Sequence, residues 1–156
     1  MLTPRIHDAP SVFTPEALLR EARRQRGLVD GAVPAVCLLD PDGDVARYLR
    51  RTGGGRASAT WACYHSELLE FDLTGTACGV VPCAVGAPYA VLVAEQLFAS
   101  GCELLVSVTS SGLITARGEP PYFVLIERAL RDEGTSGNYL PDSDWSELAP
   151  ALRAWM

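Results

Sequence analysis

The chain contains no lysine: all 13 of its basic residues are arginine, against 19 acidic residues, which gives a formal net charge of −6. Non-specific binding of nucleic acids depends on neutralising many phosphates with basic side chains, and binding to anionic lipid surfaces has the same requirement. The charge balance therefore argues against both nucleic acids and membranes as partners.

Long apolar runs are also missing. No stretch approaches the roughly 18 uninterrupted apolar residues of a membrane-spanning helix, and residues 1–10 do not place an apolar segment after a basic one, as a secretory signal does. We therefore expect a cytoplasmic protein. Its 156 residues, 48% of them apolar, are enough for one domain with a packed core.

Cysteine and histidine are too few, or wrongly spaced, for a metal site. The five cysteines form no CxxC pair, and the two histidines, His7 and His65, have no cysteine at ligand spacing. In a reducing compartment we expect the cysteines to be small buried hydrophobic residues rather than disulfide partners or zinc ligands. They are Cys37, Cys63, Cys78, Cys83 and Cys102. No metal or other cofactor is expected.

Thr14, Pro15 and Gly27 predict a helix over 15–26, because a capping hydroxyl and a proline suit the first turn of a helix and a glycine suits its end. Residues 1–13 are expected to form a loose arm. The outer face of the helix is rich in arginine, which predicts a solvated face or, alternatively, a site for an anion or a partner. Its arginines are Arg20, Arg23, Arg24 and Arg26.

Apolar strands alternate with helices along the rest of the chain, which indicates an α/β domain with a mainly parallel sheet. The predicted strands are 34–39, then 61–73 and 76–85 as a hairpin, then 103–109, and finally 122–130, which reads as a strand or a short helix. The predicted helices are 45–49, 90–100 and an amphipathic one over 144–156. The segment 50–58, rich in arginine and glycine, predicts a flexible surface loop or, alternatively, a mobile anion-binding loop.

Three segments that follow apolar runs are candidates for a site, because ligands of open α/β sheets bind beyond the carboxyl ends of strands. The first, 108–112, has consecutive hydroxyls and a glycine, which suits an anion nest of backbone amides or a plain polar turn. The second, 83–88, leads through Gly86 into a helix with free first amides, or is a simple turn. The third, 131–139, clusters charges and hydroxyls as a surface loop or a site loop.

His65 and Glu67 form a further candidate. On a strand, their side chains share one face with Cys63, so that Glu67 lies beside His65 as an orienting carboxylate lies beside a general base. The alternative is a structural or exposed histidine.

The joint order of these segments resembles the nucleoside phosphorylase family, which includes uridine and bacterial purine nucleoside phosphorylases. Leu38-Leu39-Asp40-Pro41 is similar to the family's first strand and its Gly-Asp-Pro turn, and Val85-Gly86-Ala87-Pro88-Tyr89-Ala90 follows in the expected place. Val108-Thr109-Ser110-Ser111-Gly112 is similar to the family's Gly-Thr-Ser/Thr-Gly loop, and 131–141 closes the match. The resemblance covers roughly residues 35–141.

The resemblance implies a three-layer α/β/α fold with a mixed, mainly parallel sheet, and a pentosyltransferase that cleaves a nucleoside N-glycosidic bond by phosphorolysis or hydrolysis. In a phosphorylase, inorganic phosphate would be the co-substrate, held by Thr109, Ser110, Ser111 and Gly112. Gly86 would line the ribose side. His65 and Glu67 are the expected catalytic residues. The residues expected to bind the nucleoside are Tyr64, Asp132, Glu133 and Tyr139.

The sequence departs from the family at both arginine positions. Ser107 stands where an arginine usually precedes the phosphate loop, and no arginine follows the turn at 42–44. Asp40, Asp42 and Asp44 instead bring negative charge near a phosphate, which is electrostatically unfavourable. Arg47 or Arg56 is the alternative cation that could substitute for the missing arginines.

Family members also continue well beyond the point that corresponds to Met156, and the missing part carries later strands, a Glu-Met-Glu ribose segment and a base-contacting acid. We therefore expect a single domain, 1–156, equivalent to the first part of the family fold, with an exposed apolar sheet edge near 103–109 and 122–130. Such an edge predicts a homo-oligomer or a second chain that completes the fold, with activity only in that assembly. The alternatives are a catalytically inactive binding or regulatory module, and a pocket reused for a non-nucleoside reaction.

Overall fold

The computed structural model describes residues 6–115 and 118–154, which belong to two compact units. Ser11–Ser111 makes up the larger unit, and Met1–Pro10 together with Gly112–Met156 makes up the smaller one. No helix in the described part of the chain is long and apolar enough to cross a membrane. The single domain over 1–156 stays a prediction.

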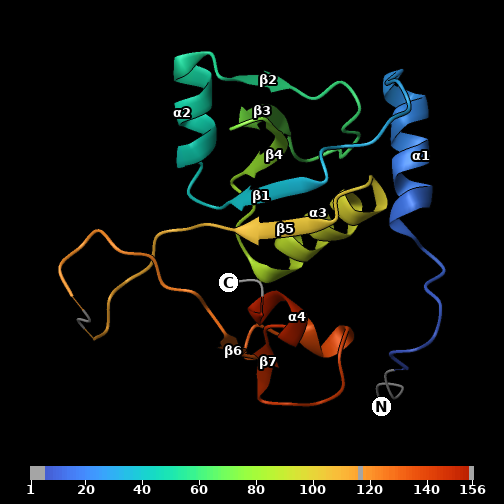
Figure 1. Ribbon diagram of the computed structural model, residues 1–156. Helices are drawn as coiled ribbons and strands as arrows, with labels where there is room; N and C mark the ends of the chain where they lie inside the picture. Colours follow the sequence, from blue (N-terminus) through green and yellow to red (C-terminus); the bar gives the residue numbers. More distant parts are fainter. Residues whose placement is uncertain (1–5, 116–117, 155–156) are drawn as a thin grey trace. The chain divides into compact units, whose positions relative to one another are not determined.

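A mixed five-stranded sheet forms the centre of the larger unit (Figure 1). In spatial order its strands are β2 (Gly55–Ala57), β3 (Leu69–Leu73), β4 (Thr76–Pro82), β1 (Val36–Asp40) and β5 (Leu104–Ser107). β1 pairs in parallel with both β4 and β5, whereas β3 pairs antiparallel with both β2 and β4. The predicted α/β class with a mixed sheet is confirmed, and the parallel part of the sheet is the half around β1.

Helices cover both faces of this sheet because its central strands are apolar on both faces. The three helices of the larger unit are α1 (Pro15–Arg26), α2 (Asp44–Thr52) and α3 (Ala87–Ala99). In β4, the adjacent residues Val80 and Val81 are both fully buried and point to opposite faces. Val81 packs in one cluster with Leu97 of α3, and Val80 packs in another with Leu49 of α2. The unit therefore has three layers, with α2 and α3 on opposite faces of the sheet (Figure 1).

The first helix begins and ends where the sequence predicts. Thr14 caps α1 by accepting a hydrogen bond from a first-turn amide at 3.3 Å, and Gly27 ends the helix in the left-handed region at a φ of 63°. Leu19 and Ala22 of α1 are fully buried, and Ala99 of α3 packs against them. This contact packs the arginine-bearing helix α1 against α3.

Segment 61–68 is not a strand, so the predicted strand over 61–73 is correct only from Leu69 onward. Trp61, Ala62 and Cys63 are all buried in succession, whereas a strand would turn alternate side chains to opposite faces. An irregular segment that buries consecutive apolar residues has the same apolar run in its sequence as a fully buried strand. The prediction of a strand was wrong here for that reason.

The loop predicted over 50–58 is also wrong in part. α2 extends through Thr52, and Gly55–Ala57 joins the sheet as β2. A Cβ atom on Gly55 would lie 3.1 Å from Leu49 Cβ, so glycine allows β2 to pack closely against α2. Arg56 then forms an ion pair with Glu70 on β3 at 2.8 Å, across the antiparallel pair. Gly55 and Arg56 therefore belong to the sheet, and Gly53 ends α2.

In the smaller unit, the predicted strand or helix over 122–130 is largely wrong, and so is the predicted helix over 144–156 as far as residue 154; residues 155 and 156 lie outside the described part of the chain. Only Arg128–Leu130 is a strand (β6), and it pairs antiparallel with β7 (Trp145–Glu147). The Arg128 guanidinium lies 4.5 Å from the centre of the Trp145 ring. Pro150 excludes a continuous helix because proline lacks an amide donor and clashes with the preceding turn, and it instead begins the short helix α4 (Pro150–Arg153).

Candidate functional site

Three chain segments leave the sheet at the carboxyl edge of its parallel strands. In the register of these strands, Asp40 at the end of β1 lies opposite Pro82 on β4, and Leu39 lies opposite Ser107 on β5. Backbone hydrogen bonds extend the pairing: the Cys83 amide donates to the Asp40 carbonyl at 2.8 Å. The turns after β1, β4 and β5 therefore begin side by side, as the sequence predicts for segments 83–88 and 108–112.

The hydroxyl-rich bend after β5 binds a carboxylate. The Ser110 amide donates to Asp42 Oδ2 at 2.5 Å, and Thr109 Oγ1 donates to the same oxygen at 3.2 Å. The hydrogen bond from the Ser110 amide lowers the pKa of Asp42 below its ordinary value, and Asp42 is exposed. The bend thus has the donors of an anion nest, and the anion that it holds belongs to this chain.

The other two acidic residues of the turn after β1 are engaged elsewhere. Asp40 is 1% exposed and accepts a hydrogen bond from the Ala46 amide at 2.9 Å, in the first turn of α2. Asp44 forms an ion pair with Arg47. Arg47 also reaches the Asp42 carbonyl at 3.4 Å, whereas Arg56, the other cation considered, is held by the β2–β3 pair. Arg47 is therefore the arginine beside the turn.

The turn after β4 contains two residues with positive φ. Gly86 precedes α3 at a φ of 91°, with no atom within 4 Å of the position that a Cβ would occupy. Cys83 adopts a φ of 59° and is exposed, so it departs from the expectation that the cysteines are buried. The open space at Gly86 is compatible with the predicted approach of a ligand to the backbone.

The structure does not pair His65 with Glu67. Glu67 forms an ion pair with Arg50 at 2.7 Å, and the His65 carbonyl accepts a hydrogen bond from Tyr89 at 2.7 Å. No hydrogen bond joins His65 to Glu67 in the described residues, and the strand that was to align them is absent. Tyr64 donates to Gln25 Oε1 on α1 at 3.0 Å. The catalytic roles of His65 and Glu67 and the binding role of Tyr64 stay predictions.

The predicted loop 131–139 lies in the smaller unit and is held by its own hydrogen bonds. Ser136 donates from its amide to Glu133 Oε1 at 2.5 Å, and hydrogen bonds from the Ser136 side chain and amide lower the pKa of Glu133. Arg131 donates to Ser136 Oγ at 2.9 Å and to the Pro141 carbonyl at 2.6 Å. Asp132 and Tyr139 are exposed, and their roles in nucleoside binding stay predictions.

The contact of Asp42 with the bend was not predicted from the sequence. The sequence places Asp42 in an acidic turn near the phosphate bend but gives no sign that it binds the bend itself. Ser111 and Gly112 follow the bend and are exposed. No group of three or more histidine, cysteine or acidic residues with the geometry of a metal site occurs among the described residues.

Comparison with solved structures gives a distant similarity to a uridine phosphorylase. The crystal structure of uridine phosphorylase from Vibrio fischeri ES114 matches with a TM-score of 0.43 and 16% sequence identity, over 51% of this chain. The match spans 33% of the length of that enzyme. No protein-family model and no curated protein matches the sequence.

Proposed function

We propose that this chain binds a nucleoside at the carboxyl edge of the five-stranded sheet and takes part in cleaving its N-glycosidic bond, by phosphorolysis or hydrolysis. The observation that carries the proposal is the bend at Thr109 and Ser110, which offers a backbone amide and a hydroxyl to one carboxylate oxygen. The same donors suit a phosphate oxygen.

Charge development explains why an anion at this position would help the reaction. As the base leaves, the ribosyl group becomes cationic, and an oxyanion fixed beside it stabilises the transition state more than the ground state. In the proposal, Thr109, Ser110, Ser111 and Gly112 hold phosphate. Gly86, in the turn after β4 at the same edge of the sheet, approaches the ribose.

The remaining predicted residues complete this proposal. His65 and Glu67 act on the leaving base or on an attacking water as proton carriers. Tyr64 of the larger unit contacts the nucleoside, and the nucleoside-binding roles of Asp132, Glu133 and Tyr139 in the smaller unit stay predictions from the sequence. Because Glu67 is paired with Arg50, the proposal requires this ion pair to loosen when substrate binds.

The test is release of free base from a panel of purine and pyrimidine nucleosides, followed by chromatography with and without phosphate. Ser110→Pro removes the amide donor of the bend, and Ser110→Ala is the matched control because it keeps that amide. We expect base release by the wild-type chain and by Ser110→Ala, and a loss of about tenfold or more in Ser110→Pro. Equal rates in the two variants would contradict a role for the bend.

A second candidate function is a catalytically inactive module that binds a small ligand. The Asp42 carboxylate favours it, because this group already occupies the donors that phosphate would need. In that case calorimetry detects nucleoside binding, and no base is released either with or without phosphate. Turnover by the isolated chain excludes this candidate.

We also propose that a second copy or another chain completes the sheet at β5. In the described residues β5 pairs only with β1, and Val106 within β5 and Val108 just after it are both exposed. An open strand edge with apolar side chains favours association. Light scattering after size-exclusion chromatography should give a mass above that of one chain, which Val106→Lys lowers. A mass of one chain at every concentration contradicts self-association. Base release that occurs only when another chain is added supports completion of the sheet by that chain.

A further inference from the structure

A cleft of about 700 Å³ lies along α1, and it contains none of the residues of the proposed nucleoside site. A volume of this order suits a small molecule. Five of the seven residues that line the cleft are charged; the lining consists of Glu16, Arg20, Arg23, Arg24, Gly27, Leu28 and Asp30. Three arginines and two carboxylates line the cleft, so its lining has a formal charge of +1, whereas the chain as a whole has a net charge of −6.

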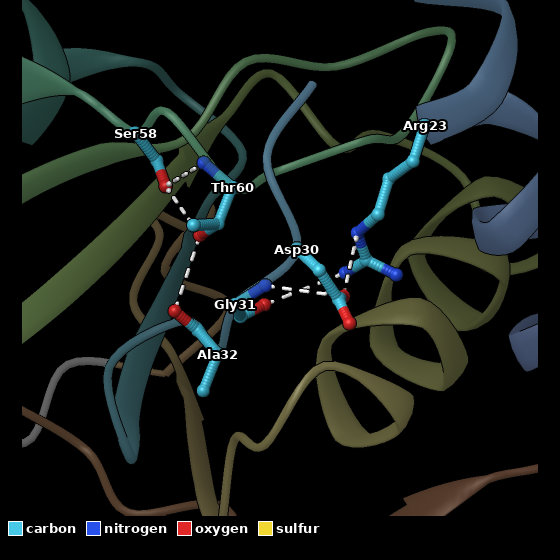
Figure 2. Close-up of polar contacts among 6 residues, drawn as sticks. All are labelled: Arg23, Asp30, Gly31, Ala32, Ser58 and Thr60. Carbon is cyan, nitrogen blue, oxygen red and sulfur yellow. Dashed lines mark hydrogen bonds and ion pairs between the residues drawn. The ribbon is translucent and has the colours of Figure 1, made fainter. Parts of the chain in front are cut away.

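Arg23 has unused hydrogen-bonding capacity in this cleft. Its side chain is only 17% exposed, and its buried Nε makes no hydrogen bond to any described residue. The nitrogen faces Asp30 Oδ1 at 3.6 Å, and a terminal nitrogen reaches the Gly31 carbonyl at 3.5 Å (Figure 2). Both contacts are long for charged hydrogen bonds, which are usually about 2.7–2.9 Å. A buried guanidinium N–H without a close acceptor is costly, so the hydrogen-bonding capacity of Arg23 is not met within the described chain.

The connector that carries Asp30 is fixed from its other side. Thr60 Oγ1 donates to the Ala32 carbonyl at 3.1 Å, and Ser58 Oγ lies 3.3 Å from the same hydroxyl (Figure 2). A Cβ on Gly31 would lie 2.7 Å from Thr60 Cγ2, so the backbone here already touches the Thr60 side chain. The opening between this connector and Arg23 is therefore set by the packing of the connector against Thr60.

Arg20 supplies a second cation. It precedes Arg23 by three residues, and residues at this spacing are neighbours on one face of a helix. Arg20 is exposed, and no hydrogen bond or ion pair to it is found within the described residues. Arg24 differs, because its Nε and one of its terminal nitrogens both donate to the Glu21 carboxylate, at 2.9 Å and 2.5 Å. Arg20 and Arg23 are thus the two guanidinium groups available to a ligand.

We propose that this cleft binds a small molecule through a phosphate or carboxylate group held between Arg20 and Arg23. The planar guanidinium presents donors that match either oxyanion. Leu28 contacts the non-polar part of the ligand. Asp30, whose side chain is 94% exposed, stands opposite Arg23 as a weak internal competitor that the ligand oxyanion displaces.

The experiment is an amide NMR titration of the full chain at constant ionic strength, with inorganic phosphate in one series and succinate in another. We expect saturable shifts at Arg23, Gly27 and Leu28 with at least one of the two anions, and the series that gives them identifies the oxyanion. Arg20→Gln should weaken binding about tenfold. Asp30→Asn should tighten it, because it removes the competing charge. Arg51→Gln, the same charge change on α2, should have no effect.

The role of Arg23 is tested by Arg23→Lys. This variant keeps the positive charge and the buried aliphatic part of the side chain but removes the guanidinium group with its Nε. Weaker binding in this variant, with an unchanged thermal unfolding midpoint, supports the proposal. It is overturned if Arg20→Gln and Arg51→Gln bind equally well, or if neither anion shifts the amides of α1. Phosphate shifts confined to residues 109–111 also overturn it, while they leave the proposed function intact.

Discussion

The Ser110 amide donates a 2.5 Å hydrogen bond to Oδ2 of Asp42, which joins the segment after β5 to the turn after β1. The two residues are 68 positions apart in the sequence and meet because β1 and β5 are parallel neighbours. A chain carboxylate thus sits on the donors that would serve a phosphate. Any ligand oxyanion at this bend must displace it.

Asp42→Ala should therefore increase the affinity of the bend for inorganic phosphate. Removing the internal competitor makes the donors available in every molecule, and an apparent gain of about tenfold is expected. The measurement is the phosphate titration of the Ser110 amide by NMR. Asp44→Ala is the matched control, because it also removes one negative charge from the turn but Asp44 pairs with Arg47. Equal gains in both variants would mean that general electrostatics, not displacement, controls binding.

Acid should release the same contact. The Ser110 amide lowers the pKa of Asp42 in the folded chain, so the hydrogen bond is complete above the ordinary carboxyl pKa of about 3.9. It is lost as the pH falls through the lowered folded value. The chemical shift of the Ser110 amide should titrate in this acidic range and not near neutrality. Asp42→Ala should abolish the transition, and a transition that persists in this variant would assign it to another group.

Local signals predicted α1 to within a residue, because Thr14, Pro15 and Gly27 act on their immediate neighbours. The central strands followed from short apolar runs for a similar reason. The errors arose where tertiary packing decides the outcome. In 61–68, three consecutive side chains are buried without a strand, and at 55–57 a strand forms because β3 is available to pair with it.

The candidate site was predictable only as a set of strand ends. Parallel strands bring their carboxyl ends to one edge, so Thr109, Gly86 and the turn after β1 could be assigned to it from the sequence. Which donor binds which acceptor depends on register and loop path. For this reason the expected contact between His65 and Glu67 is absent, and the Glu67 carboxylate pairs with Arg50 of α2 instead.

Thiol labelling should separate Cys83 from the other cysteines. Cys83 is exposed, whereas Cys37, Cys63, Cys78 and Cys102 are buried. Burial raises the pKa of Cys37 to about 12 and also raises the pKa values of Cys78 and Cys102. Iodoacetamide near pH 8 should add one group to the native chain and five after denaturation. Mass spectrometry measures the number of labelled thiols. The native Cys83→Ser variant should not be labelled. Rapid labelling of Cys37 in the native chain would contradict the packing of β1.

Gly79→Ala should destabilise the chain although Gly79 lies in a regular strand. A Cβ there would lie 2.8 Å from Cys37 Sγ and 3.3 Å from Leu68 Cδ1, and both partners are almost fully buried. Overpacking of this kind costs about 1–3 kcal/mol, which urea unfolding would measure as a lower midpoint.

The exposed control is Gly112→Ala, where no atom lies within 4 Å of the added carbon, and the expected change is within about 0.5 kcal/mol. Cys37→Ala removes the nearest obstacle, so the double variant Cys37→Ala/Gly79→Ala should lose less stability than the sum of the two single variants. Strict additivity would show that the cost at Gly79 does not come from contact with Cys37, and hence that the β1–β4 packing differs from the one described.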